Sequence, residues 1–417
     1  MLTTLAAPAF AKTWYIENGD ITISAGKTEG TNKVSQGSTT DEEDTDTVIT
    51  NNNRDTASSH TVTIDAGNDK VEVTLDNVNI KADSGSALTS NGDVTLTLKG
   101  ENHLTGGNGD TYGGDGITSS GSLTISGGTV TATGGNNTGS DGSGGSGIYS
   151  VSGSVTISGG TVNANGGNGG TISGGDGICS SGGVTISSGS TVTANGGSGE
   201  DGSGGRGITS NGGVTVSGGT VNAKGGSGKN GNGGDGILSF NPVAISGGTV
   251  KSNGGSGTIS GGDGIRSLDH VAISGGTVKS NGGSGTNSGG YGIISNDIDL
   301  SGSLELTAKA GSPNGKALSR ADSELDLDTI KDKLGPGAKV TTTDADGKVN
   351  QVSISRPVEP EKPVIPEESS SSSGGGSSAP SAPVSSIPGL TVTDKSGAVI
   401  SYTSTQSGNT LTVCVGR

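Results

Sequence analysis

The sequence predicts an all-β protein built around a right-handed parallel β-helix, with three short strands and about 28–31 residues in each turn. The first observation is a Gly-Ile pair that recurs seven times along the middle of the chain. Its isoleucines are Ile117, Ile148, Ile178, Ile208, Ile237, Ile265 and Ile293. The pairs Ala87-Leu88 and Ala317-Leu318 occupy the equivalent position before and after this series, which gives about nine turns.

The second observation is strand-like alternation inside each repeat, as in "GICS", "GVTIS" and "TVTA" around residue 178. Successive side chains point to opposite faces of a strand. One face of these runs is formed by Ile178 and Ser180, Val184 and Ile186, and Val192 and Ala194. The next repeat carries the same types at the same places, so stacked turns would place isoleucine on isoleucine. Right-handed crossovers are the rule between parallel strands, which decides the expected handedness.

The composition favours stacked turns over an ordinary globular core. The 417 residues include 84 glycines, with 27% hydrophobic and only 2% aromatic side chains. A short apolar run that lacks its own core can be buried against a copy of itself. The net charge of −16 argues against nucleic acid as a partner, and no apolar run reaches the roughly 20 residues of a membrane helix. We expect a monomer without membrane insertion.

Composition shifts divide the chain into six expected segments. They are a signal-peptide remnant at 1–11, an N-terminal cap and loop at 12–59, the β-helix at 60–320, a C-terminal cap at 321–355, a disordered linker at 356–388 and a small β segment at 389–417. Ala9 and Ala11 form an A-x-A-like cleavage pattern, which indicates a secreted or cell-surface protein.

The caps are expected to protect the exposed ends of the β-helix. "TWYIENGDITIS" would cover the first turn, and the acidic run at 41–46 is expected in a loop. "LDLDTIKDKLGPG" reads as a short helix, and the following residues read as a hairpin that turns at Asp346-Gly347.

Three outward columns of side chains are the candidate functional sites. The third strand of each turn presents Thr131, Asn163, Thr193, Asn222, Lys251 and Lys279. Lys224 is near this column, so the later turns carry a basic stripe on an acidic protein. Ammonium groups along a flat sheet suit a linear polyanion such as an acidic polysaccharide, and plain solubility is the alternative interpretation.

The second column precedes each Gly-Ile pair and is rich in charge. It contains Asp115, Ser146, Asp176, Arg206, Asp235, Asp263 and Tyr291. In register, Arg206 lies between two aspartates, while Asp235 and Asp263 are neighbouring like charges about 5 Å apart, which is unfavourable without a cation. These two carboxylates could bind calcium together with loop carbonyls. The alternative is that they are solvated loop carboxylates.

The third column is outward on the Gly-Ile strands. It contains Thr118, Tyr149, Cys179, Thr209, Leu238, Arg266 and Ile294. Its mixed character suggests a covered or binding face, and Tyr149 could stack on a sugar. A charge at inward Ile208 is expected to unfold neighbouring turns, whereas outward Thr209 should tolerate one. Asn165, Asn195, Asn253 and Asn281 should form a turn-stabilising ladder.

The sequence gives little support to an enzyme. The chain has only three histidines, and neither a Ser-His-Asp nor a Cys-His arrangement can be argued from their positions. The outward strand positions are mainly threonine, asparagine and lysine rather than the clustered carboxylates and aromatic subsites of glycan-cleaving enzymes. We therefore expect a non-catalytic protein.

The segment "VEVTLDNVNIKADSGSALTSNGDVTLTLKGENHLTGG" at 71–107, followed by "GGDGITSSGSLTISGGTVTATGG", resembles the secreted bacterial carbohydrate-binding parallel β-helix family. The resemblance covers about residues 45–320. It implies a non-catalytic protein that binds plant-type polysaccharide and is often associated with calcium. This chain departs from the family pattern in its few aromatic residues and its irregular loop carboxylates.

Three classes of function follow from these observations. The leading one is a secreted, non-catalytic binder of polysaccharide, of an acidic kind. The second is a cell-surface adhesin or structural stalk that presents its terminal modules, and the third is a polysaccharide lyase or hydrolase.

Overall fold

A computed structural model describes residues 11–139, 141–321, 323–356, 402–407 and 410–415. The chain divides into two compact units, Met1–Pro357 and Val358–Arg417. The expected signal-peptide remnant lies outside the described residues except for Ala11, and the expected linker lies outside them except for Arg356.

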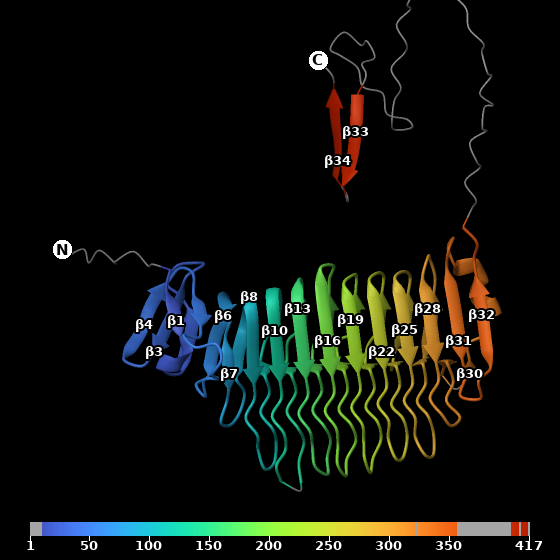
Figure 1. Ribbon diagram of the computed structural model, residues 1–417, viewed down its shortest axis with the longest axis horizontal. Coiled ribbons are helices and arrows are strands. Elements are labelled where there is room, and N and C mark those ends of the chain that lie inside the picture. The colour runs from blue at the N-terminus through green and yellow to red at the C-terminus, as the bar shows by residue number, and fades with distance from the viewer. Residues whose placement is uncertain (1–10, 140, 322, 357–401, 408–409, 416–417) are drawn as a thin grey trace, which may run out of the picture. The chain divides into compact units, whose positions relative to one another are not determined.

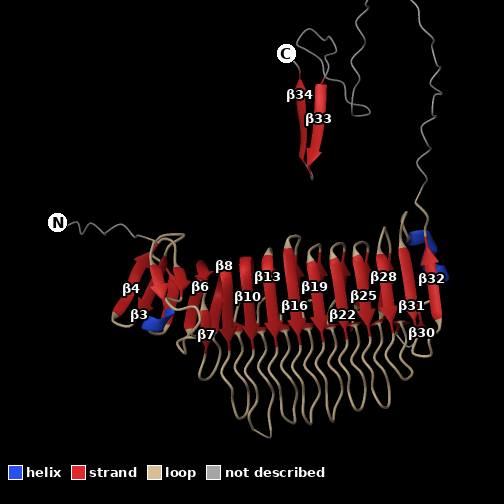
Figure 2. Cartoon of the chain, viewed as in Figure 1, coloured by secondary structure: helices blue, strands red, loops and turns tan. Residues whose placement is uncertain are grey.

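The first unit is a right-handed parallel β-helix of about nine turns, as the sequence predicts. Its turns stack side by side from the N-terminal to the C-terminal end (Figure 1), and helical segments occur only near its two ends (Figure 2). No helix in the described part of the chain is long and apolar enough to cross a membrane.

Each regular turn contributes one strand to each of three parallel sheets. The first sheet contains the Gly-Ile strands β9 (Ile117–Ser119), β11 (Ile148–Ser150), β14 (Ile178–Ser180), β17 (Ile208–Ser210), β20 (Ile237–Ser239), β23 (Ile265–Ser267), β26 (Ile293–Ser295) and β29 (Leu318–Arg320). The second contains β12 (Val155–Ile157), β15 (Val184–Ile186), β18 (Val214–Val216), β21 (Val243–Ile245), β24 (His270–Ile273) and β27 (Asp297–Leu300). The third contains β13 (Gly160–Asn165), β16 (Ser190–Asn195), β19 (Thr220–Lys224), β22 (Thr249–Asn253), β25 (Thr277–Asn281), β28 (Glu305–Lys309) and β31 (Lys339–Thr343).

Strands in the earlier turns are longer and run across the corners between the sheets. They are β6 (Val62–Asp76), β8 (Leu88–Thr105) and β10 (Leu123–Thr133), with the short β7 (Asn79–Lys81) beside β8. In its first part β8 pairs with the Gly-Ile strand β9, and in its later part it pairs with β10. These turns therefore join the same three sheets without breaks at the corners.

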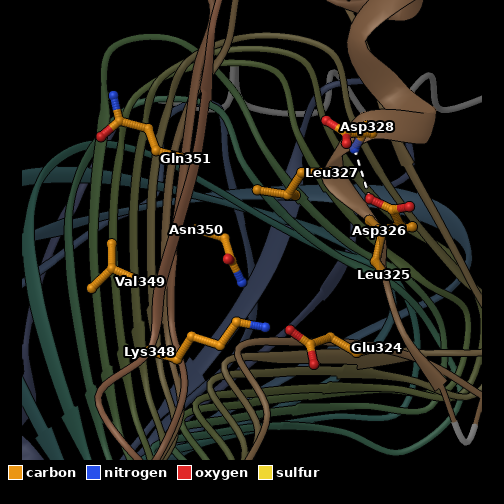
Figure 3. A pocket seen from close by; sticks show the side chains of 9 residues that line it. All are labelled: Glu324, Leu325, Asp326, Leu327, Asp328, Lys348, Val349, Asn350 and Gln351. Carbon is orange, nitrogen blue, oxygen red and sulfur yellow. Dashed lines mark hydrogen bonds between the residues drawn. The ribbon is translucent and has the colours of Figure 1, made fainter.

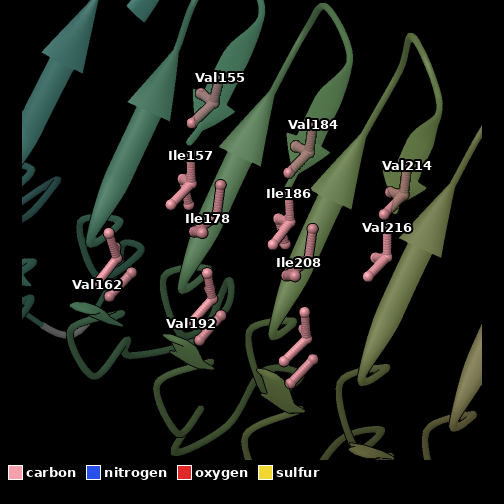
Figure 4. Packing of buried hydrophobic residues seen from close by; sticks show 14 of the residues in the cluster. Val155, Ile157, Val162, Ile178, Val184, Ile186, Val192, Ile208, Val214 and Val216 are labelled. Atoms are coloured by element: carbon pink, nitrogen blue, oxygen red, sulfur yellow. The ribbon is translucent and has the colours of Figure 1, made fainter. Parts of the chain in front are cut away.

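The register of the turns confirms the predicted stacking of like residues. Ile148 pairs with Ile117 on one side and with Ile178 on the other, and Leu88 and Leu318 extend this column at its ends. All seven isoleucines of the Gly-Ile pairs are fully buried. Figure 4 shows successive turns of this core, in which valines and isoleucines from the three sheets meet. Each turn thus buries its apolar side chains mainly against the turns beside it.

Glycine is required where the long loops leave and rejoin the sheets. The Gly175 N–H donates to the Gly167 carbonyl within one turn, and the Gly197 N–H donates to the Gly175 carbonyl from the next turn. A Cβ atom on Gly175 would lie 1.8 Å from the Gly145 carbonyl oxygen, which is impossible without moving the backbone. The close approach of neighbouring loops therefore explains much of the glycine content.

The N-terminal cap contains more strands than the sequence predicts. Its elements are β1 (Thr13–Tyr15), the 3-10 segment η1 (Ile16–Asn18), β2 (Ile21–Ala25), β3 (Asn32–Gln36), β4 (Thr39–Asp44) and β5 (Val48–Thr50). Trp14 is buried and its indole Nε1 donates to Asp44 Oδ2 at 2.7 Å.

Most of the acidic run at 41–46 is in strand β4, so the prediction of a loop is wrong. This strand pairs antiparallel with β3 alone and is an edge strand, on which Asp41 and Glu42 are exposed, Glu43 is half-buried and Asp44 is buried. Charged side chains are tolerated there and discourage pairing with another chain.

The C-terminal cap contains a helical segment and a hairpin, as predicted. The segment η2 (Leu327–Lys333) is a 3-10 helix that buries Leu327 and Ile330, and the two-residue strand β30 (Ser323–Glu324) precedes it. Strand β31 pairs antiparallel with β32 (Val349–Ser353) around the predicted turn.

The second unit contains a two-stranded antiparallel hairpin in its described part. The hairpin is formed by β33 (Tyr402–Ser407) and β34 (Thr410–Val415). The sequence predicts a small β segment at 389–417, and the described residues of this region form these two strands.

Candidate functional sites

Four lysines lie on the outward face of four successive strands of the third sheet, β19, β22, β25 and β28. Lys251 and Lys279 are register partners on β22 and β25, and both side chains are exposed. Lys224 pairs with Asn253, so it lies in the column next to these two, where Lys309 follows Asn281. The sequence analysis missed Lys309, although "ELTAK" aligns with "TVKSN" of the two preceding turns. We call Lys224, Lys251, Lys279 and Lys309 the lysine face.

The lysine face has no local neutralising partner. The ion pairs of other lysines involve residues elsewhere in the described chain, and none includes a member of the lysine face. The other outward residues of β19, β22, β25 and β28 are threonine and asparagine, except for Glu305. Neighbouring strands are about 4.8 Å apart, so the ammonium groups of Lys251 and Lys279 repel each other unless an anion lies between them.

The predicted asparagine ladder is confirmed beside this face. Asn195 Nδ2 donates to Asn165 Oδ1 at 2.9 Å, and Asn281 Nδ2 donates to Asn253 Oδ1 at 2.8 Å. Lys224 interrupts the ladder between these two pairs. These side-chain hydrogen bonds link the end of β13 to that of β16 and the end of β22 to that of β25, the two strands that carry Lys251 and Lys279.

The aspartates that precede the Gly-Ile pairs link neighbouring turns. In each case Oδ1 accepts the backbone N–H of the equivalent residue in the next turn: Asp115 from Ser146, Asp176 from Arg206, Asp235 from Asp263, and Asp263 from Tyr291, at 2.6–2.7 Å. The sequence analysis placed these residues in one column but missed this role, because a side-chain bond to the backbone leaves no periodic signal of its own.

Asp235 and Asp263 are the most buried charged pair of this column. Their side chains are only 14% and 6% exposed. Burial, together with the neighbouring Asp235 carboxylate, raises the pKa of Asp263 to about 7. Burial also raises the pKa of Asp235. Two adjacent carboxylates in this setting need a positive partner.

Two guanidinium groups supply positive charge to this pair. Arg206 Nε lies 3.8 Å from Asp235 Oδ2, and Arg266 Nη1 donates to Asp263 Oδ2 at 3.2 Å. The contact of Arg206 with Asp235 agrees with the predicted position of Arg206 between two aspartates. Arg206 contacts the other aspartate, Asp176, through its backbone N–H and not through its side chain. In the described residues no group of three or more His, Cys, Asp or Glu side chains is placed to hold a metal ion. Calcium at Asp235 and Asp263 stays a prediction.

These charged residues line a groove of about 340 Å³. On four successive turns its lining runs from a polar residue through glycine to a residue of the charged column: from Ser203 to Arg206, from Asn232 to Asp235, from Ser260 to Asp263 and from Ser288 to Tyr291. We call the four polar residues the serine wall, and the charged column together with Arg266 the arginine wall. We call this depression the arginine groove.

The outward column of the first sheet is largely covered, and this corrects the prediction for Thr209. Its side chain is buried and its hydroxyl donates to Asp176 Oδ2 at 2.6 Å, so a new carboxylate there would face an existing one. Tyr149 is half-buried between Thr118 and Cys179, and burial raises the pKa of its phenol. Its expected contact with a sugar stays a prediction.

Two further cavities lie at the caps. A cavity of about 540 Å³ at the C-terminal end is lined by residues 324–328 and 348–351 (Figure 3). Its Asp326 caps η2 by accepting the Asp328 N–H at 2.9 Å, which gives that carboxylate a structural role. A cavity of about 770 Å³ at the N-terminal end is lined mainly by the polar loop at 25–32. Neither set of lining residues contains a histidine or a cysteine.

Comparisons with known proteins give no relative of this chain: no family model, curated protein or solved structure matches it.

Proposed function

We propose that this chain is a secreted, non-catalytic protein that binds an anionic polysaccharide on its lysine face. The observation that carries the proposal is the position of four exposed lysines without ion-pair partners on four successive strands, in a chain of net charge −16. The resemblance of residues 45–320 to secreted carbohydrate-binding β-helices supports it, as does the cleavage pattern at Ala9 and Ala11.

The geometry of the lysine face suits a linear polymer that lies along the helix axis. Each turn advances by about 4.8 Å, so a chain crossing β19 to β28 meets a new ammonium group at each strand. The flanking threonine hydroxyls and asparagine amides can bond sugar hydroxyls. Because the strands are held in one register, the groups are already in place before the ligand arrives, which lowers the ordering cost of binding.

The test is the affinity of the purified chain for polygalacturonate and for a neutral glucan. The doubly substituted Lys251→Gln/Lys279→Gln variant should bind polygalacturonate about twofold to thirtyfold more weakly, because each of the two exposed lysine–carboxylate contacts is worth about 0.2–1 kcal/mol. A matched control is Lys316→Gln/Lys331→Gln, which makes the same change in net charge at two lysines outside the lysine face.

Three results would contradict the proposal. Equal loss of affinity in both variants would show that only net charge matters and not the lysine face. Absence of binding to every glycan would favour the adhesin or stalk, and release of sugar fragments from the polymer would favour the lyase or hydrolase.

A further inference from the structure

The arginine groove has hydrogen-bond donors that the fold does not use. Arg206 and Arg266 each have side chains that are 44% exposed, and each contacts one carboxylate through one nitrogen. A guanidinium group has five N–H donors in a planar fork. Most of these donors on both arginines therefore remain available to a molecule in the groove.

The aspartates hold the arginines in place without using their full donor capacity. The Oδ1 atoms of Asp235 and Asp263 are occupied by backbone N–H groups of the next turn, so only the Oδ2 atoms face the arginines. In a preorganised binding site, neighbouring side chains fix the orientation of the residues that contact the ligand. Here the aspartates fix the orientation of the arginines in this way.

The other surfaces of the groove suit a hydroxylated ligand. Ser260 and Ser288 form a hydroxyl pair at 2.9 Å on the serine wall, with Ser203 and Asn232 in line with them. Tyr291 lies on the turn after Asp263 and provides an aromatic ring and a phenol. The volume of about 340 Å³ is at the lower end of small-molecule sites, which run from roughly 300 to 1,000 Å³.

We propose that the arginine groove is a second binding site, which takes a sugar acid with its carboxylate on Arg206 and Arg266 and its hydroxyls against the serine wall. Planar guanidinium groups match carboxylate geometry and bind it through paired hydrogen bonds. The site is on the loop side of the first sheet and uses none of the residues of the lysine face, so it is independent of the proposed function.

The experiment measures the affinity of the full chain for glucuronate and for glucose, which differ at the carboxylate. Glucuronate should bind more tightly than glucose, and Arg266→Gln should weaken glucuronate binding by about tenfold or more, as expected for a lost charged hydrogen bond. Arg320→Gln is the matched control, because it removes an arginine that pairs with a carboxylate outside the groove. Its affinity for glucuronate should equal that of the unchanged chain.

Further measurements distinguish this site from the lysine face and from a calcium site. Lys251→Gln/Lys279→Gln should leave glucuronate binding unchanged, whether or not it weakens polysaccharide binding. A chelator should also have no effect, and loss of binding with chelator would overturn the proposal because calcium would then hold the carboxylate. Equal affinities for glucuronate and glucose, or equal effects of the two arginine substitutions, would overturn it as well.

Discussion

At the scale of single residues, the aspartates before the Gly-Ile pairs combine a structural bond with an unfavourable charge. Each of them satisfies a backbone N–H of the next turn through Oδ1. Burial of the same carboxylates raises the pKa of Asp115, Asp235 and Asp263. An asparagine could accept the same N–H without carrying a charge.

This contrast predicts how stability changes with pH. The folded pKa of Asp263 is about 7, above the roughly 3.9 of an unfolded aspartate. The folded state therefore holds this proton more tightly, and the resulting stabilisation is complete below about pH 4 and is lost as pH rises through 7. Thermal unfolding should show the Tm of the unchanged chain falling between pH 5 and pH 8, and Asp263→Asn should remove much of that slope. Parallel profiles for the two proteins would contradict the assignment to Asp263.

At the scale of elements, the sequence predicts the strands of the regular turns well, because both the apolar alternation and the Gly-Ile spacing are strictly repeated. Elements that are used once are predicted less evenly: the helical segment and hairpin of the C-terminal cap are confirmed, whereas strand β4 is missed. Strand β4 is built from "TTDEED", which has a poor strand propensity and is stabilised by its pairing with β3. The prediction for Thr209 is wrong for another reason. Strand alternation assigns this residue to the outward face, but it does not show whether other residues cover that face, and Thr209 is buried.

The loop glycines give a prediction at this scale. Gly175→Ala would place a Cβ 1.8 Å from a backbone oxygen of the preceding turn, whereas Gly183→Ala, in the same repeat, has its nearest neighbour at an ordinary 3.5 Å. We expect Gly175→Ala to lower the free energy of unfolding by about 1–3 kcal/mol or more. The loops of neighbouring turns are stacked, so one loop cannot shift to make room for the methyl group without displacing the next. Denaturant unfolding of the two variants measures the difference. Equal stabilities of the two variants would show that the loops of neighbouring turns are not packed as closely as their backbone hydrogen bonds imply.

At the scale of the whole molecule, each candidate site is formed by side chains from several stacked turns, so it depends on how the turns align and cannot be seen in a single repeat. Lys251 and Lys279 could be aligned from the sequence, because their repeats have identical strands. The arginine groove could be predicted only in part. The column of residues before the Gly-Ile pairs places Arg206 beside Asp235, whereas Arg266 belongs to another column and meets Asp263 only through the length of its side chain. The net charge of the chain, −16, opposes the approach of any polyanion.

The chain as a whole is negatively charged, whereas the lysine face is positively charged. We therefore expect the affinity for polygalacturonate first to rise and then to fall as the salt concentration increases. At about 0.01 M ionic strength the screening length is about 30 Å, so the whole molecule repels the polymer. At about 0.1–0.15 M it is about 8–10 Å, which screens the distant carboxylates while the lysine contacts persist. At about 1 M it is about 3 Å, and the contacts themselves weaken. Affinity measured across this range should pass through a maximum.

The maximum should disappear when Lys224, Lys251, Lys279 and Lys309 are all replaced by glutamine. Without the local attraction only the repulsion remains, so any residual binding should rise steadily as salt screens it. A steady fall in affinity with salt for the unchanged chain would mean that local contacts outweigh the net charge even at long screening lengths. A maximum that survives the fourfold replacement would place the attractive site elsewhere on the molecule.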